Sequence, residues 1–140
     1  MQSSLASYQF ELANSLPEIS RMSDWLTEML ADISVSDELA YAVRLCTVEA
    51  VTNIVSYAFA PGTEHRIGIN LDVVPDRIVV VVTDDGNRFD PTAHKPAEPA
   101  ADLASAAIGG LGIVLMRQFA TGMSYARQDA SNRLELRFAR

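Results

Sequence analysis

The chain has 140 residues, of which 49% are hydrophobic and 21% charged, so we expect one folded domain over residues 1–140 rather than a disordered chain. It carries 11 basic and 18 acidic residues, and the net charge of -7 argues against direct nucleic-acid binding, which depends on Lys and Arg. No run approaches the roughly 20 apolar residues of a membrane span. The single cysteine, Cys46, and the lack of a signal-like N-terminus predict a cytoplasmic protein without internal disulfides.

The first part of the chain predicts a strand followed by two helices. Residues 8–14 alternate between apolar and polar, as a half-buried strand does. Apolar residues then recur at helical spacing over 17–33, and again over 39–57. Ser36 or Asp37 can cap the second helix, which has an apolar face about five turns long.

The middle of the chain predicts a hairpin. Residues 67–74 and 77–83 are strand-like and are separated only by Pro75-Asp76, which favours a tight antiparallel turn. The second strand is apolar throughout, so we expect it to be central and covered on both faces. The prolines at 91, 96 and 99 then predict a loop over 91–107, with a short helix near 102–107.

The last part of the chain predicts a helix over 113–120, then strands near 123–128 and 133–138 joined by a turn at 129–132. The complete order is strand, helix, helix, strand, strand, loop, helix, strand, strand. This order predicts the α+β class, as a two-layer α/β sandwich with helices on one face of a mixed, mostly antiparallel sheet.

Glu49 and Asn53 lie four residues apart on the second predicted helix, one above the other and flanking its apolar stripe. An Asn amide oxygen suits Mg²⁺ held between triphosphate oxygens. A Glu can position or deprotonate an attacking hydroxyl. Taken alone, the pair also fits a solvated helix edge.

Asp84 follows the apolar strand, and Gly86 comes two residues later. A carboxylate here can accept a hydrogen bond from an adenine amino group, and a glycine lets the backbone approach the ring. Phe89, followed by Asp90-Pro91, can line such a pocket or seat the loop. The competing interpretation is an ordinary turn, because Asp and Gly are turn residues.

Gly109, Gly110, Leu111 and Gly112 form a predicted loop-to-helix junction. Free N–H groups at a helix N-terminus, together with the helix dipole, favour anions such as phosphate. A flexible hinge is the alternative for a glycine-rich junction taken alone.

In order and spacing, the three motifs resemble the Bergerat-type ATP-binding fold shared by gyrase B, histidine kinases and MutL. The short chain and the Asp-x-Gly-x-x-Phe-Asp-Pro sequence over 84–91 are similar to one branch, the anti-sigma factor serine/threonine kinases. The resemblance extends from about Phe10 to Phe138.

The resemblance implies ATP and Mg²⁺ as cofactors, with Glu49 as the catalytic residue, Asn53 as the magnesium ligand and 91–108 as the ATP lid. The nucleotide-binding residues that it implies, or that the motifs above suggest, are Asn53, Asp84, Gly86, Phe89, Gly109, Gly110, Leu111 and Gly112. It further implies a kinase that binds a sigma factor and phosphorylates a Ser or Thr of a STAS-type antagonist. A homodimer through the sheet face opposite the nucleotide is also implied.

Some positions depart from the resemblance. Tyr57 stands where many relatives carry His, and Arg88 stands where many ATPases of the wider fold carry Gly. The predicted lid has one basic residue, Lys95, which favours an alternative function: a non-catalytic, nucleotide-gated module that sequesters a sigma factor or another regulator. A histidine-kinase catalytic domain is a third hypothesis, and the lack of a preceding phosphoacceptor helix argues against it.

Overall fold

The computed structural model describes residues 5–93 and 110–140 of the chain. The predicted short helix near 102–107 and nearly all of the predicted lid lie outside the described residues. The elements follow in the order β1 (Ala6–Ala13), α1 (Leu16–Asp32), α2 (Asp37–Tyr57), β2 (Arg66–Val74), β3 (Arg77–Asp84), the 3-10 turn η1 (Pro91–Ala93), α4 (Gly110–Phe119), β4 (Gly122–Gln128) and β5 (Ser131–Ala139). The predicted order of strands and helices is confirmed.

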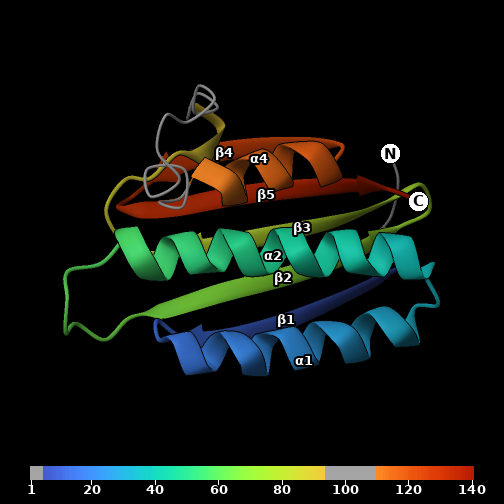
Figure 1. The fold of residues 1–140 in the computed structure, drawn as a ribbon, viewed down its shortest axis with the longest axis horizontal. Helices are drawn as coiled ribbons and strands as arrows, with labels where there is room; N and C mark the ends of the chain where they lie inside the picture. Colours follow the sequence, from blue (N-terminus) through green and yellow to red (C-terminus); the bar gives the residue numbers. More distant parts are fainter. Residues whose placement is uncertain (1–4, 94–109) are drawn as a thin grey trace.

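The five strands form one sheet in the order β1-β2-β3-β5-β4 (Figure 1). All four pairings are antiparallel, so the expectation of a mixed sheet is wrong in this detail. The helices α1 and α2 follow β1 and lead the chain back to the end of the sheet where β1 finishes. The strand β2 starts there, with Arg66 opposite Ala13, and runs antiparallel to β1. Along the chain, α4 connects β3 to β4. In the sheet, however, β5 lies between β3 and β4 and pairs antiparallel with both.

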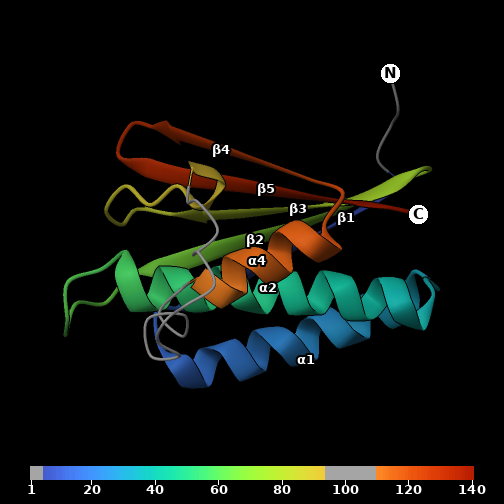
Figure 2. The same cartoon turned by 45° about the horizontal axis from the view of Figure 1, so that its top comes forward.

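The three helices of the described residues cover one face of the sheet, which gives the predicted two layers (Figures 1 and 2). The helix α2 crosses the middle of the sheet, with α1 on one side and α4 on the other. Its long apolar side includes Val43, Cys46 and Val51, which are all buried in the core. By length and composition α2 could cross a membrane. This is weak evidence for a membrane span, because a buried helix in the core of a globular protein passes the same test.

Helix and strand ends follow from local chemistry. The Ser36 hydroxyl accepts the Leu39 N–H at 3.1 Å, so Ser36 is the cap of α2. The helix α4 begins at Gly110, three residues before the predicted start. As predicted, β3 is the central strand, but the described helices cover only one of its faces; on the other face Val79 is half-buried.

The β4–β5 turn is shorter than predicted. It consists of Asp129 and Ala130, both with positive φ, of 53° and 64°. A two-residue turn with positive φ at both positions matches the twist of the flanking strands. Asn132 therefore belongs to β5, where it lies directly opposite Asp84 of β3 and is buried.

Candidate nucleotide site

Asn53 lies on the core side of α2 and is only 5% exposed. The prediction that it flanks the apolar stripe is wrong, because Asn53 is three residues after Ala50 and seven after Cys46, both of which are buried. Its Nδ2 is buried and forms no hydrogen bond with any of the described residues. A buried amide group without a hydrogen-bond partner destabilises the folded state unless a ligand supplies that partner.

Glu49 lies one turn before Asn53 and is half-buried. Its carboxylate forms no hydrogen bond or ion pair with the described residues, and it lies against the first turn of α4. A methyl group built on Gly112 would meet Glu49 Oε2 at 2.6 Å. Only a glycine at position 112 therefore leaves this carboxylate where it is.

Asp84 ends β3 and is 6% exposed. Its Oδ1 accepts the Gly86 N–H at 2.8 Å and Asn132 Nδ2 at 3.0 Å. Burial raises the pKa of Asp84, while the hydrogen bonds from Asn132 and Gly86 oppose that rise. The other carboxylate oxygen, Oδ2, accepts no hydrogen bond from the described residues, so it is available to a ligand.

Gly86 holds the turn after Asp84 against the end of α2. A methyl group on Gly86 would meet the Ala58 carbonyl oxygen at 2.6 Å and the Ala58 Cβ at 2.7 Å. The next residue, Asn87, donates its N–H to the same carbonyl at 2.7 Å. Glycine is therefore required for the close approach of the two backbones.

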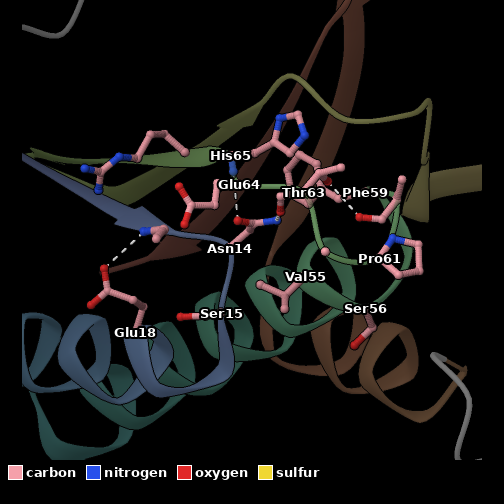
Figure 3. A pocket seen from close by; sticks show the side chains of 14 residues that line it. Asn14, Ser15, Glu18, Val55, Ser56, Phe59, Pro61, Thr63, Glu64 and His65 are labelled. Carbon is pink, nitrogen blue, oxygen red and sulfur yellow. Dashed lines mark hydrogen bonds between the residues drawn. The ribbon is translucent and has the colours of Figure 1, made fainter.

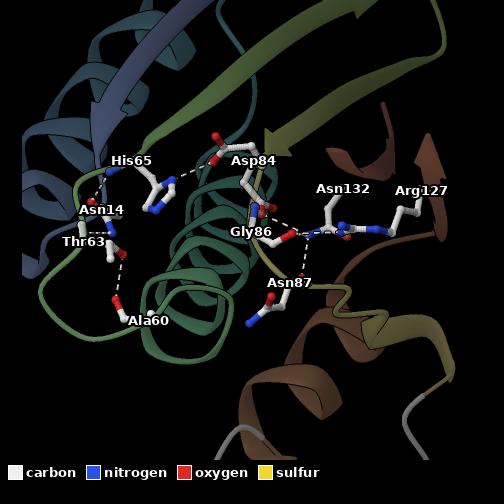
Figure 4. Close-up of polar contacts among 10 residues, drawn as sticks. Asn14, Ala60, Thr63, His65, Asp84, Gly86, Asn87, Arg127 and Asn132 are labelled. Carbon is white, nitrogen blue, oxygen red and sulfur yellow. Dashed lines mark hydrogen bonds and ion pairs between the residues drawn. The ribbon is translucent and has the colours of Figure 1, made fainter. Parts of the chain in front are cut away.

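Three residues of the β4–β5 hairpin complete this polar cluster, and no sequence motif pointed to them; Figure 4 shows two of them, Arg127 and Asn132. Asn132, 4% exposed, donates to Asp84 and to the Asn87 carbonyl at 2.8 Å. Arg127 donates to the Gly86 carbonyl and to Asn132 Oδ1, both at 2.9 Å. The Tyr125 hydroxyl also donates to Asn132 Oδ1.

Phe89 lies at the edge of the same site. Its ring stacks on Tyr57, with centroids 6.1 Å apart and planes 23° apart. The loop beyond Phe89 is held by Asp90, which accepts the Thr92 N–H at 2.9 Å, and by Arg117, which donates to the Thr92 carbonyl at 2.9 Å. Tyr57 thus provides an aromatic contact at the edge of the site.

These elements meet around a small cavity of about 10 Å³. Residues from α2, β3, β4, β5, α4 and the loop after β3 line it: Ala50, Asn53, Ile54, Asp84, Phe89, Pro91, Met116, Tyr125, Asn132 and Leu134. The described groups fit a nucleotide, because the Asn53 NH₂ group has no partner among the described residues and Asp84 Oδ2 is a free acceptor at the same site. A base needs more space than one water molecule, so some of the lining side chains must move to admit it.

The glycine-rich junction is described in part. Gly109 lies outside the described residues, while Gly110, Leu111 and Gly112 form the first turn of α4. The N–H groups of a first helical turn have no acceptor within the helix. Gly112 faces Glu49, so this turn and the predicted catalytic residue are neighbours.

The described residues contain no cluster of three or more His, Cys, Asp or Glu side chains able to hold a metal. A Mg²⁺ ion here would therefore depend on Asn53 and on the oxygens of a nucleotide. His65 serves a different purpose, because it stacks on Phe59 at 4.4 Å and its Nδ1 lies 3.0 Å from Asp85 Oδ1.

A larger hollow of about 980 Å³ lies between the start of α1 and the loop after α2 (Figure 3). Its polar groups pair with one another: Asn14 donates to the Thr63 carbonyl at 3.0 Å, and the His65 N–H donates to Asn14 Oδ1 at 2.8 Å. None of its described side chains has a buried atom without a partner. The smaller cavity therefore remains the candidate site.

Residues 12–138 match the family described as the histidine kinase-like ATPase domain. Serine/threonine-protein kinase BtrW of Bordetella bronchiseptica is 36% identical over 112 residues, which cover 80% of this chain and 79% of BtrW. Serine-protein kinase RsbW of Bacillus subtilis is 31% identical over 78 residues, which cover 53% of this chain and 49% of RsbW. The match to RsbW thus spans about half of each protein.

Two solved structures share the fold. The RsbU and RsbW domains of Rv1364c from Mycobacterium tuberculosis align over 96% of this chain and 33% of that chain, with a TM-score of 0.65 and 13% identity. The histidine kinase domain of the blue-light activated histidine kinase EL346 from Erythrobacter litoralis covers 87% of this chain and 59% of that chain, with a TM-score of 0.57 and 17% identity. At these identities the likeness concerns the fold alone.

The resemblance drawn from the sequence is confirmed by a family match over nearly the whole chain and by relatives that are serine/threonine kinases. The chain belongs to the family of histidine kinase-like ATPase domains, in which the curated relatives BtrW and RsbW are serine or serine/threonine kinases.

Proposed function

We propose that this chain is a cytoplasmic protein kinase that binds ATP with Mg²⁺ and phosphorylates a Ser or Thr of a STAS-type antagonist. In the proposed cycle it also binds a sigma factor, which the unphosphorylated antagonist displaces. Residues 1–140 act as one ATP-binding domain with a lid over about 91–108. The observation that carries the proposal is that Asn53 and Asp84, from two elements, line one cavity, while Glu49, one turn before Asn53, lies against the first turn of α4.

Each residue has a distinct role in the proposed reaction. Asp84 accepts a hydrogen bond from the adenine amino group through its free oxygen, and Asn53 holds the magnesium ion. The N–H groups at the start of α4 bind phosphate oxygens, with Gly112 allowing the close approach. When bound, Mg²⁺ would supply positive charge against the transferring phosphoryl group.

Glu49 acts on the protein substrate. It accepts the proton of the Ser or Thr hydroxyl as the hydroxyl oxygen attacks the γ-phosphorus and ADP leaves. Two observations support this role: the carboxylate has no partner among the described residues, and it lies against the turn that would hold the phosphates. Positioning and electrostatics then supply most of the catalysis.

Labelled ATP tests this function directly. The purified chain is incubated with γ-labelled ATP, MgCl₂ and a candidate STAS-domain partner protein. We expect stable label on a Ser or Thr of the partner, and its loss in Glu49→Gln, which removes the proton acceptor but keeps the size of the side chain. Glu38→Gln, at the exposed start of the same helix, is the matched control.

A second candidate function is a nucleotide-gated binding module without chemistry. The single basic residue of the predicted lid, Lys95, favours it, because few cations are then available to a transferring phosphoryl group. This function predicts that ATP or ADP changes the capture of a sigma factor while no label reaches any partner. Full transfer by Glu49→Gln would argue against the role of Glu49, and label on a His would favour a histidine kinase.

A further inference from the structure

We propose that Asn132, held by Arg127, fixes Asp84 as a hydrogen-bond acceptor and so makes the site select a 6-amino purine over a 6-oxo purine. This inference rests on the proposed function, because it assigns base selectivity to two residues that act on the base by way of Asp84. Asn132 and Arg127 are thus positioning residues on the β4–β5 hairpin.

The direction of each hydrogen bond follows from the chemistry of Arg127. A guanidinium group can only donate. Arg127 donates at 2.9 Å to Asn132 Oδ1, so this atom must be the amide oxygen. The Tyr125 hydroxyl donates to the same atom. The Asn132 NH₂ group therefore points the other way, toward Asp84 (Figure 4).

The surroundings of the Asn132 NH₂ group agree with this orientation. Nδ2 lies 3.0 Å from Asp84 Oδ1 and 2.8 Å from the Asn87 carbonyl oxygen, and both atoms accept. A flipped amide would place its oxygen against these acceptors and its NH₂ group against Arg127. Because Asn132 is only 4% exposed, water cannot relieve such a mismatch.

Asp84 is the last member of the relay. Its Oδ1 accepts both Asn132 Nδ2 and the Gly86 N–H, which favours the ionised carboxylate over a protonated one. The Oδ2 atom is then an acceptor as well. An acceptor matches the exocyclic amino group of adenine and repels the 6-oxo group of hypoxanthine or guanine.

Register explains why these residues meet. Asp84 and Asn132 are direct partners across β3 and β5, and Arg127 is the partner of Asn132 across β4 and β5. Three neighbouring strands thus bring a carboxylate, an amide and a guanidinium group into one row. Burial raises the pKa of Asp84, and the hydrogen bonds that Asn132 and Gly86 donate oppose that rise.

The test compares ATP with ITP, which carries an oxo group in place of the amino group. Calorimetry with MgCl₂ should show the wild-type chain binding ATP about 100-fold more tightly than ITP, the size of a hydrogen bond to a charged group. In Asn132→Leu the preference should fall below about 10-fold, mainly through weaker ATP binding. Arg127→Gln, a milder change, should lower the preference at least roughly threefold. Arg133→Gln, on the exposed face of β5, should leave it unchanged.

If Asn132 and Arg127 have only a structural role, the variants should bind ATP and ITP more weakly by the same factor. That result, or an unchanged preference in Arg127→Gln, overturns the proposal even if Asn132→Leu does not fold. If the wild type binds neither nucleotide, the proposed function fails, and the relay is tested separately by NMR without nucleotide. The Asn132 side-chain NH₂ protons should then exchange slowly, and faster in Arg127→Gln; equal exchange in the two proteins overturns the relay.

Discussion

The Glu49 carboxylate and the backbone of Gly112 are in contact, so that a methyl group on Gly112 would lie 2.6 Å from Glu49 Oε2. This contact joins the proposed proton acceptor on α2 to the proposed phosphate-binding turn of α4. A substitution of Gly112 should therefore affect phosphoryl transfer and stability differently, because the added group would meet the end of the flexible Glu49 side chain rather than the core.

Gly112→Ala should therefore reduce phosphoryl transfer without reducing stability. The new methyl group displaces the Glu49 carboxylate, and we expect transfer to fall roughly 100-fold, as for a lost acid–base group. Helix propensity favours Ala over Gly by about 1 kcal/mol, so the melting temperature should hold or rise. Transfer assays and thermal melts check this, with Val114→Ala on the exposed side of α4 as the control. Normal transfer by a folded Gly112→Ala protein would contradict the assigned position of Glu49.

Asp84→Asn should abolish selective ATP binding and leave the fold at least as stable at neutral pH. The Asn side chain keeps an acceptor for Gly86 and Asn132, but it presents an NH₂ group where Oδ2 was. A donor then faces the amino group of adenine, and ATP affinity should fall at least about 10-fold. Calorimetry measures the loss; undiminished ATP affinity would show that Asp84 does not contact the base.

The pH dependence of Asp84 has a definite sign. Because burial raises its folded pKa above the ordinary value of 3.8, the folded state binds the extra proton first. Wild-type stability from this group therefore declines as pH rises from 3.8 through the folded pKa, and is constant above it. Asp84→Asn lacks this dependence, so its stability advantage should shrink as pH falls through that window. An advantage that grows toward acid pH in denaturant titrations would contradict the raised pKa.

Asn53→Ala should remove the magnesium dependence of ATP binding. The wild-type amide has a buried Nδ2 without a partner, which costs about 1–3 kcal/mol. Removing it should offset the packing lost, so the melting temperature should not fall. The measurement is ATP affinity in MgCl₂ and in EDTA, with Asn70→Ala of β2 as the control. If Asn53→Ala binds ATP more tightly with magnesium by the same factor as the wild type, Asn53 is not the ligand.

Ala130→Gly should stabilise the protein. Ala130 has a φ of 64°, and left-handed backbone costs a residue with a Cβ about 1–2 kcal/mol. After the greater chain entropy of Gly is subtracted, a gain of about 0.5–1 kcal/mol remains, or a rise of about 2–4 °C in melting temperature. Ala126→Gly, on an exposed strand position, should instead destabilise. A lower melting temperature for Ala130→Gly would show that the turn is not as described.

Much of the fold was predictable because periodicity reports directly on burial. The apolar steps through Val43, Cys46 and Ala50 required one long buried helix, and the pair Pro75-Asp76 required a hairpin. The same periodicity also indicates that Asn53 is buried, because Asn53 occupies a core position of that helix. The prediction missed it because a polar residue was assumed to lie beside the stripe.

The β4–β5 half of the site could not be predicted in the same way. Asn132 follows Asp129, Ala130 and Ser131, and these residue types indicate a turn. Its burial depends on which residue of β3 it pairs with, and this register is set by the whole sheet rather than by local sequence. Arg127 and Tyr125 are two residues apart on β4, a spacing found in any strand. Local sequence therefore does not predict that both donate hydrogen bonds to Asn132.

Calorimetric titration of the purified wild-type chain with ATP, in MgCl₂ and again in EDTA, tests the central claim most directly. The account predicts uptake of about one nucleotide per chain, with tighter binding when magnesium is present. No heat of binding in MgCl₂ from a folded protein would contradict it, since Asn53, Asp84 and the start of α4 would then not form one nucleotide site.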